Sequence, residues 1–225
     1  SATRARAAAE AEDGRIVCWA SRTGPDFDHA TEGFTGQILR MEDGFIRSRG
    51  LGSDFVGALS VTLDDLGVYY DATRASRLEV LIQQGGFSPD LLARAGRLRE
   101  RIVSAGLSKY NLPAPPGAFD TWPRDRQRIL IVGQVENDQS ILKGCADIRT
   151  NAGLVAAVRA DHPDAFLIYK NHPDVLAGNR PGMLDGAALD AVDASADGLD
   201  IIQCLDHADR LATLTSLSGF EALLR

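Results

Sequence analysis

The segment that most constrains the fold is Arg128–Asp138, with the sequence RILIVGQVEND. Four large aliphatic residues, Ile129–Val132, run into Gly133, and polar residues follow. A short, β-branched run closed by glycine predicts a strand buried on both faces, as in parallel sheets. Open α/β sheets bind ligands at the carboxyl ends of their strands. We therefore expect a site formed by the polar residues that follow this strand, namely Gln134, Glu136, Asn137 and Asp138.

Composition and charge narrow the class of protein. The chain has 225 residues, of which 44% are hydrophobic and 24% charged, as expected for one large or two small globular domains. A net charge of −7 argues against a broad nucleic-acid surface, but it allows a local basic pocket for an anionic substrate. The three cysteines match no zinc or disulfide spacing, so we predict no metal and a reducing compartment. No apolar run reaches the roughly 18 residues of a membrane span, which favours a cytoplasmic protein.

Alternating strand and helix patterns on both sides of a proline-rich segment predict an α/β protein with two Rossmann-like halves. The predicted domains are residues 1–110 and 128–225, joined by a linker at 111–127. In the first half we expect helices at 1–14, 76–84 and 89–106, strands at 15–20 and 37–41, a glycine-rich loop at 50–57, and a hairpin-like pair of 59–63 with 68–71. In the second half we expect strands at 129–132, 165–169, 199–204 and 212–214, and helices at 146–162, 184–196, 207–211 and from 220 onward. The sequence stops inside that last helix, so we expect the second half to be incomplete.

The motif Lys170-Asn171-His172-Pro173 directly follows the predicted strand 165–169. It suits an anionic phosphate, because an imidazole donates a hydrogen bond, an ammonium adds positive charge, and a helix starting at the proline adds its dipole. The alternative is a loop histidine that satisfies backbone groups. The dipeptide recurs at His162-Pro163, but that histidine ends an amphipathic helix and is interpreted as structural. We therefore select His172 and Lys170 as candidate phosphate-binding residues.

Hydroxyl groups gather in Thr215-Ser216-Leu217-Ser218-Gly219, just before the last predicted helix. Three hydroxyls and free backbone amides at a helix start can hold a phosphate. Ser218 and Glu221 can equally form a capping box, which needs no ligand. Both interpretations stay open on the sequence alone.

A second acidic motif, Glu42-Asp43-Gly44, follows the predicted strand 37–41. Alone, it is most simply a turn. Paired with Asp138 from the other half, across a cleft between the two sheets, it would supply the two carboxylates that glycosyl chemistry commonly uses.

Six blocks, taken together and in order, resemble the KpsC family of bacterial capsular polysaccharide β-Kdo transferases. The blocks are Arg40–Ser48, Gly67–Ala72, Ser108–Asn111, Val132–Asp138, Tyr169–Asp174 and Thr215–Leu224, and the resemblance runs from about Arg15 to the end of the chain. It implies a retaining GT-B glycosyltransferase without a cofactor that transfers Kdo from CMP-Kdo to a lipid-linked oligo-Kdo acceptor. It also implies peripheral contact with the cytoplasmic face of the inner membrane and with capsule-export machinery.

The same resemblance implies roles for individual residues. Asp138 matches the nucleophile that forms an aspartyl-Kdo adduct, and Glu42 and Asp43 match the acid/base carboxylates. The Glu-Asp-Gly motif is also similar to one in bacterial sialyltransferases, which use a CMP-activated keto-sugar acid. The residues implied in CMP binding are Gln134, Lys170, His172, Pro173, Thr215, Ser216, Ser218 and Glu221. Arg47 and Arg40 are further candidates that could hold a donor carboxylate bidentately.

Two alternatives to a Kdo transferase remain open at this point. One is another GT-B enzyme, such as a sialyltransferase-like or epimerase-like protein that shares the His-Pro and carboxylate motifs. The other is a non-catalytic protein that binds a donor or a partner in polysaccharide biosynthesis and export.

Overall fold

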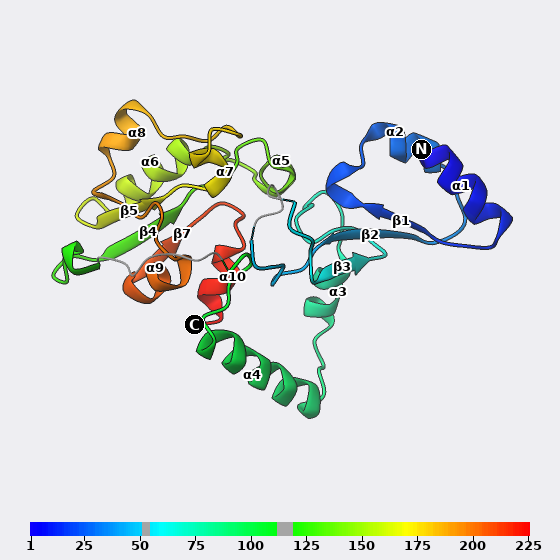
Figure 1. Cartoon of the computed structure of the whole chain (residues 1–225), viewed down its shortest axis with the longest axis horizontal. Helices are drawn as coiled ribbons and strands as arrows, with labels where there is room; N and C mark the ends of the chain where they lie inside the picture. The colour runs from blue at the N-terminus through cyan, green and yellow to red at the C-terminus, as the bar shows by residue number, and fades with distance from the viewer. Residues whose placement is uncertain (51–54, 112–118) are drawn as a thin grey trace. The chain divides into compact units, whose positions relative to one another are not determined.

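The computed structural model describes residues 1–50, 55–111 and 119–225 (Figure 1). The chain divides into two compact units, Ser1–Arg47 with Ala58–Phe87 and Ser48–Gly57 with Ser88–Arg225. This division differs from the predicted domains, because residues 88–110 group with the second unit. The predicted glycine-rich loop at 50–57 and the predicted linker at 111–127 lie partly outside the described residues.

The first unit is built on a three-stranded mixed sheet in the order β1-β2-β3. Strand β1 (Ile16–Trp19) is parallel to β2 (Ile38–Asp43), and β3 (Val61–Asp64) is antiparallel to β2. Its helices are α1 (Ala2–Ala11), η1 (Ala20–Arg22), α2 (Pro25–Thr31) and α3 (Arg77–Gln84). Helix α3 begins where the sequence predicts, because Ser76 and Glu79 form a capping box. Helix α2 was not predicted.

Two sequence predictions for this unit need correction. Strand β2 continues through Asp43, so Glu42 and Asp43 end the strand and do not follow it. The hairpin-like pair of 59–63 with 68–71 is wrong, since residues 61–64 pair with β2. The reason lies at Asp64, whose Oδ1 accepts the N–H groups of Leu66 and Gly67 at 2.8 Å each and so closes a turn after β3.

The second unit is built on a four-stranded parallel sheet in the order β6-β5-β4-β7. The strands are β4 (Arg128–Val132), β5 (Phe166–Lys170), β6 (Ala194–Ser195) and β7 (Arg210–Ala212). The helices are α4 (Pro89–Ser104), η3 (Phe119–Thr121), α5 (Gln139–Gly144), α6 (Asn151–Asp161), α7 (Pro173–Leu176), α8 (Gly186–Asp190), α9 (Ile201–His207) and α10 (Ser218–Leu223). No helix among the described residues combines the length and apolar character that crossing a bilayer requires.

Both faces of this parallel sheet are covered, as the sequence predicts for a Rossmann-like half (Figure 1). Ile131 and Leu167, both fully buried, point to the face covered by α6 and α8. Leu130 and Ile168 point to the opposite face, where α9 and Trp122 pack. Trp122 belongs to the predicted linker, so at least this part of that segment is built into the core of the second unit.

The sequence assigned several elements of the second unit wrongly. The predicted strand 199–204 is mostly helix α9, because the Asp200 carboxylate accepts the Gln203 N–H (2.9 Å) and caps a helix. The predicted helix 207–211 is wrong, since residues 210–212 form β7 alongside β4. Helix α6 starts at Asn151, not at 146, because Thr150 caps it. The expected helix 184–196 shortens to α8 and is followed by β6.

Candidate functional site

The polar edge of the second unit's sheet brings several predicted site residues together. Strands β4, β5 and β7 are parallel, so their carboxyl ends share one edge. At this edge the Gln134 side chain joins the loops after β4 and β7: its Oε1 accepts the Thr215 N–H (2.8 Å) and its Nε2 donates to Thr215 Oγ1 (3.0 Å). Gly133 allows the close packing expected there, because a Cβ would collide with the Tyr169 hydroxyl.

Asp138 lies at this edge as the N-cap of α5 and is exposed. Its Oδ1 accepts the backbone N–H of Ser140 (2.9 Å) and the Ser140 hydroxyl (2.8 Å). The Ser140 hydroxyl in turn accepts from Thr215 Oγ1 (3.2 Å), which ties the cap to the loop after β7. Within the described part of the chain, no donor contacts Oδ2 of Asp138, so one carboxylate oxygen faces outward.

His172 is half-buried and caps α7. Its Nδ1 accepts the Asp174 N–H (3.2 Å). Burial lowers the pKa of the imidazole; the charges of Asp174 and Asp138 oppose this shift, and those of Lys109 and Arg180 add to it. The ring is therefore neutral at pH 7, and because Nδ1 accepts a hydrogen bond, Nε2 carries the proton and is a donor. Asp138 and His172 follow the neighbouring parallel strands β4 and β5, so both lie at the same edge of the sheet.

A buried amide that the sequence analysis did not single out holds these loops in place. Asn151, 1% exposed at the start of α6, accepts the Gln134 N–H at Oδ1 (2.9 Å). Its Nδ2 donates to the carbonyl oxygens of Gln134 (2.8 Å) and Gly182 (2.7 Å). Its backbone N–H donates to Glu136 Oε1 (2.7 Å). Asn151 therefore fixes the backbone on the approach to Asp138.

The hydroxyl-rich loop leads into α10, whose N-cap is Leu217, so the alternative capping box of Ser218 with Glu221 does not form at the helix start. Both residues are buried inside the unit. Glu221 Oε1 accepts the Lys109 N–H (2.8 Å), and burial raises the pKa of this carboxyl. The Ser216 hydroxyl accepts the Ser218 N–H (3.2 Å). Glu221 thus anchors the segment around Lys109, while the nucleotide-binding roles of all three residues stay predictions.

Lys170 has a structural contact that the sequence did not predict. Its Nζ donates to the carbonyl oxygens of Ala196 (3.1 Å) and Leu199 (2.6 Å), which joins β5 to the segment after β6. Burial lowers the pKa of this ammonium group. Neighbouring Asn171 is held by the Asp197 carboxylate through its backbone N–H (2.8 Å) and its Nδ2 (2.9 Å). A role for Lys170 in phosphate binding stays a prediction.

The first unit contains the other predicted carboxylates and Arg47. Glu42 is 7% exposed, and its Oε2 accepts from the Ser21 N–H (3.0 Å) and the Tyr70 hydroxyl (3.2 Å). Asp43 Oδ2 pairs with Nε of the buried Arg47 at 2.8 Å. Asp43 Oδ1 is buried and, among the described residues, has no hydrogen-bond partner. Both Glu42 oxygens accept hydrogen bonds, whereas Asp43 Oδ1 accepts none among the described residues.

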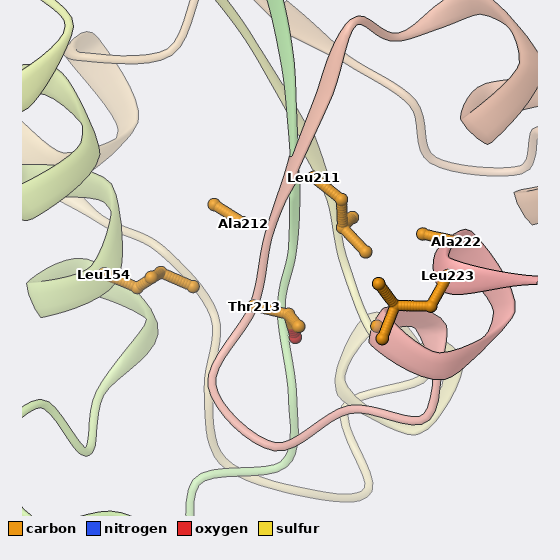
Figure 2. Close-up of a pocket in the computed structure, with 7 residues that line it drawn as sticks. Leu154, Leu211, Ala212, Thr213, Ala222 and Leu223 are labelled. Carbon is orange, nitrogen blue, oxygen red and sulfur yellow. The ribbon is translucent and has the colours of Figure 1, made fainter.

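Two pockets lie in the second unit, one beside β7 and one beside β6. One, of about 410 Å³, lies beside β7, and Figure 2 shows its mostly apolar lining of Leu154, Leu211, Ala212, Thr213, Ala222 and Leu223. The other, of about 510 Å³, lies beside β6 and includes Tyr169, Asn171 and Asp197. Neither pocket is lined by Asp138 or His172. The candidate site is therefore assigned from the chemistry of its side chains and not from the volume of a pocket.

The fold and this polar edge define an α/β protein of the GT-B-like class, with a doubly wound parallel sheet in its second unit. The chain belongs to the family described as capsule polysaccharide biosynthesis protein, whose sequence model matches residues 15–225. This finding confirms the family resemblance and the fold class predicted from the sequence.

Relatives and solved structures agree with this assignment. The chain is 42% identical to the capsule polysaccharide modification protein LipA of Neisseria meningitidis serogroup A over 95% of its own length and 30% of the relative. It is 42% identical to the lipopolysaccharide-processing protein LpsZ of Rhizobium meliloti over 84% of its length and 43% of the relative. The chain thus spans less than half of these curated relatives.

Two solved structures of Thermosulfurimonas dismutans KpsC have the same fold. The β-Kdo 2,4 transferase superposes with a TM-score of 0.81 and 32% identity, covering 93% of this chain and 65% of that structure. The β-Kdo 2,7 transferase gives a TM-score of 0.76 and 31% identity, covering 100% of this chain and 66% of that structure.

Proposed function

We propose that the chain is part of a retaining β-Kdo transferase of capsular polysaccharide biosynthesis that uses CMP-Kdo as donor and a lipid-linked oligo-Kdo acceptor. The observation that carries the proposal is that the exposed Asp138 carboxylate and the neutral His172 ring follow the adjacent strands β4 and β5 at their shared carboxyl edge. The solved relatives named as β-Kdo transferases support it. Peripheral contact with the inner membrane and with the export machinery belongs to the same proposal, through the lipid-linked acceptor.

In the proposed first step, the outward oxygen of Asp138 attacks the anomeric carbon of the donor. The bond from that carbon to the phosphate oxygen breaks, and CMP leaves with the electron pair. The Nε2–H of His172 donates to the phosphate and stabilises its growing charge. A neutral imidazole suits this task, because it donates a hydrogen bond to the phosphate without a positive charge that would compete for the Asp138 carboxylate.

In the proposed second step, an acceptor hydroxyl displaces the aspartyl adduct, and its proton passes to a carboxylate of the first unit. We favour Asp43 over Glu42 for this base, because Glu42 already accepts hydrogen bonds from Ser21 and Tyr70. Two displacements at one carbon return it to its original configuration, so the linkage is formed with retention.

A donor comparison with product analysis tests this function. The protein is incubated with an oligo-Kdo acceptor and, in parallel, with CMP-Kdo, CMP-sialic acid or a UDP-sugar. We expect transfer from CMP-Kdo only, and a trapped Kdo adduct, located by mass spectrometry, on the peptide that contains Asp138. Transfer from another donor would assign a different GT-B activity, and an adduct on a different peptide would exclude Asp138 as the nucleophile.

A further inference from the structure

Hydrogen bonds join the loop between α7 and α8 to the segment that precedes Asp138 and to Asn151. The Glu136 N–H donates to the Pro181 carbonyl (3.2 Å), and Asn151 Nδ2 donates to the Gly182 carbonyl (2.7 Å). Gly182 has φ +132°, and a Cβ there would lie 2.6 Å from the Gln134 carbonyl oxygen. Only glycine permits this approach without strain. The loop around Arg180 is therefore held in a defined position beside the site.

Arg180 extends from this loop to the residue next to Asp138. Its Nη2 donates to Asn137 Oδ1 at 2.8 Å, and its Nε lies 3.3 Å from the same oxygen. The partner is a neutral amide, and across the described residues the guanidinium forms no ion pair. Two of its five N–H groups are engaged, so three donors and the full positive charge remain available at the exposed end.

Two of the cations predicted to bind the sugar-nucleotide donor already have partners within the protein. The Lys170 ammonium donates to two carbonyl groups, and Arg47 pairs with Asp43. The charge of Arg180, by contrast, acts on the His172 ring, together with that of Lys109, whose ammonium lies 5.0 Å from the centre of the Tyr110 ring. Positive charge near His172 thus comes from residues that the sequence analysis did not select.

We propose that Arg180 is a binding residue for an anionic group of the sugar-nucleotide donor, with Asn137 as the residue that positions it. The planar fork of a guanidinium matches a carboxylate or a phosphate with two parallel hydrogen bonds. CMP-Kdo contains both a carboxylate and a phosphate. The ligand group that Arg180 binds is therefore one of these two oxyanions. This inference rests on the proposed function and adds a residue to its donor site.

Two measurements on the protein test the assignment. CMP is titrated calorimetrically into the wild type and the R180A, R180K and R124A variants, and the KM for CMP-Kdo is measured for each. R124A is the matched control, since Arg124 is exposed and precedes the amino end of β4, away from the carboxyl edge. We expect R180A to weaken donor binding by about 10- to 100-fold, R180K to recover part of the loss, and R124A to match the wild type.

The pattern of losses identifies the anion. A weaker affinity for CMP itself assigns Arg180 to the phosphate, whereas an unchanged CMP affinity with a raised KM for CMP-Kdo assigns it to the Kdo carboxylate. If R180A binds CMP and uses CMP-Kdo as the wild type does, the assignment of Arg180 is overturned while the proposed function stands. If the wild type binds no CMP and transfers no Kdo, the proposed function fails and the assignment fails with it.

Discussion

The two units hold their candidate carboxylates in different ways. Glu42 and Asp43, in the first unit, are bound by Ser21, Tyr70 and Arg47. Asp138, in the second unit, is exposed and uses one oxygen to cap α5. A nucleophile must present an unshared oxygen to its substrate, whereas a carboxylate that accepts several hydrogen bonds stabilises the fold. This contrast supports the proposal that Asp138 is the nucleophile, and it predicts a larger structural role for the first unit's carboxylates.

The two sheets also place these carboxylates differently. In the second unit all four strands are parallel, so the loops after β4, β5 and β7 leave from one edge. In the first unit β3 runs against β2, so Glu42 and Asp43 pair with residues at the start of β3. The partners of their side chains come from segments next to the sheet: Ser21 in η1, Arg47 after β2 and Tyr70 after β3.

The largest effect expected from this comparison is the loss of transfer in D138N. Asparagine caps a helix as well as aspartate does, so α5 and the unfolding free energy should be retained to within about 0.5 kcal/mol. The amide is a poor nucleophile, so Kdo transfer should fall by roughly four orders of magnitude. Steady-state transfer rates and urea unfolding together measure the two quantities.

D200N is the matched control for that variant. Asp200 caps α9 in the same unit through an equivalent hydrogen bond, 2.9 Å to the Gln203 N–H, and it lies outside the proposed site. We expect D200N to transfer Kdo at the wild-type rate. If D138N kept substantial activity, Asp138 would be only a helix cap, and the functional distinction between the two units would be lost.

The elements predicted well from the sequence are those with strong local signals. The apolar runs that form β4 and β5 and the helices α3 and α4 were identified correctly. The run at 199–204 was misassigned, because a short apolar segment fits a buried helix face as well as a strand. Asn151 and Arg180 were missed, because single polar residues in or beside loops have no periodicity, and their partners are 17 and 43 residues away.

The next largest expected effect is a loss of unfolding free energy in the second unit, caused by the substitution N151D. The substitution replaces two N–H donors by a charge that faces the carbonyl oxygens of Gln134 and Gly182 in a buried site. An uncompensated buried charge should lower the unfolding free energy by about 3–5 kcal/mol. The chain has two tryptophans, so a W19F background leaves Trp122 as the fluorescent probe of this unit during urea unfolding.

N179D provides the matched control, since Asn179 is exposed in the same unit. Its unfolding free energy should stay within about 0.5 kcal/mol of the wild type, as for most surface substitutions. If N151D were as mild as N179D, the loops leading to Asp138 would not depend on the buried amide, and Asn151 would lose its assigned role.

A smaller effect is expected in the first unit for E42Q. The amide keeps one acceptor but turns an N–H group toward the donors of Ser21, Tyr70 or Asp43, so at least one buried hydrogen bond is lost. This should lower the unfolding free energy by about 1–3 kcal/mol. A W122F background leaves Trp19, in β1, to report on this unit. The exposed Glu12 supplies the control E12Q, and equal stabilities for the two variants would contradict a structural role for Glu42.

The smallest expected effect is a pH dependence that separates the histidines of the two units. Burial lowers the pKa of His172, so below the ordinary histidine pKa of about 6.5 the unfolded chain binds a proton that the folded chain resists. Stability contributed by the neutral ring is therefore complete above that pH and is lost as the pH falls through the lowered folded pKa. H172N, which keeps an N-cap acceptor, should flatten the acid side of a plot of unfolding free energy against pH. H29N should leave that plot unchanged, because the His29 side chain is already 89% exposed in the folded chain. Equal slopes for H172N and the wild type would mean that the ring is as well solvated as His29, and a neutral donor at pH 7 would then need another cause.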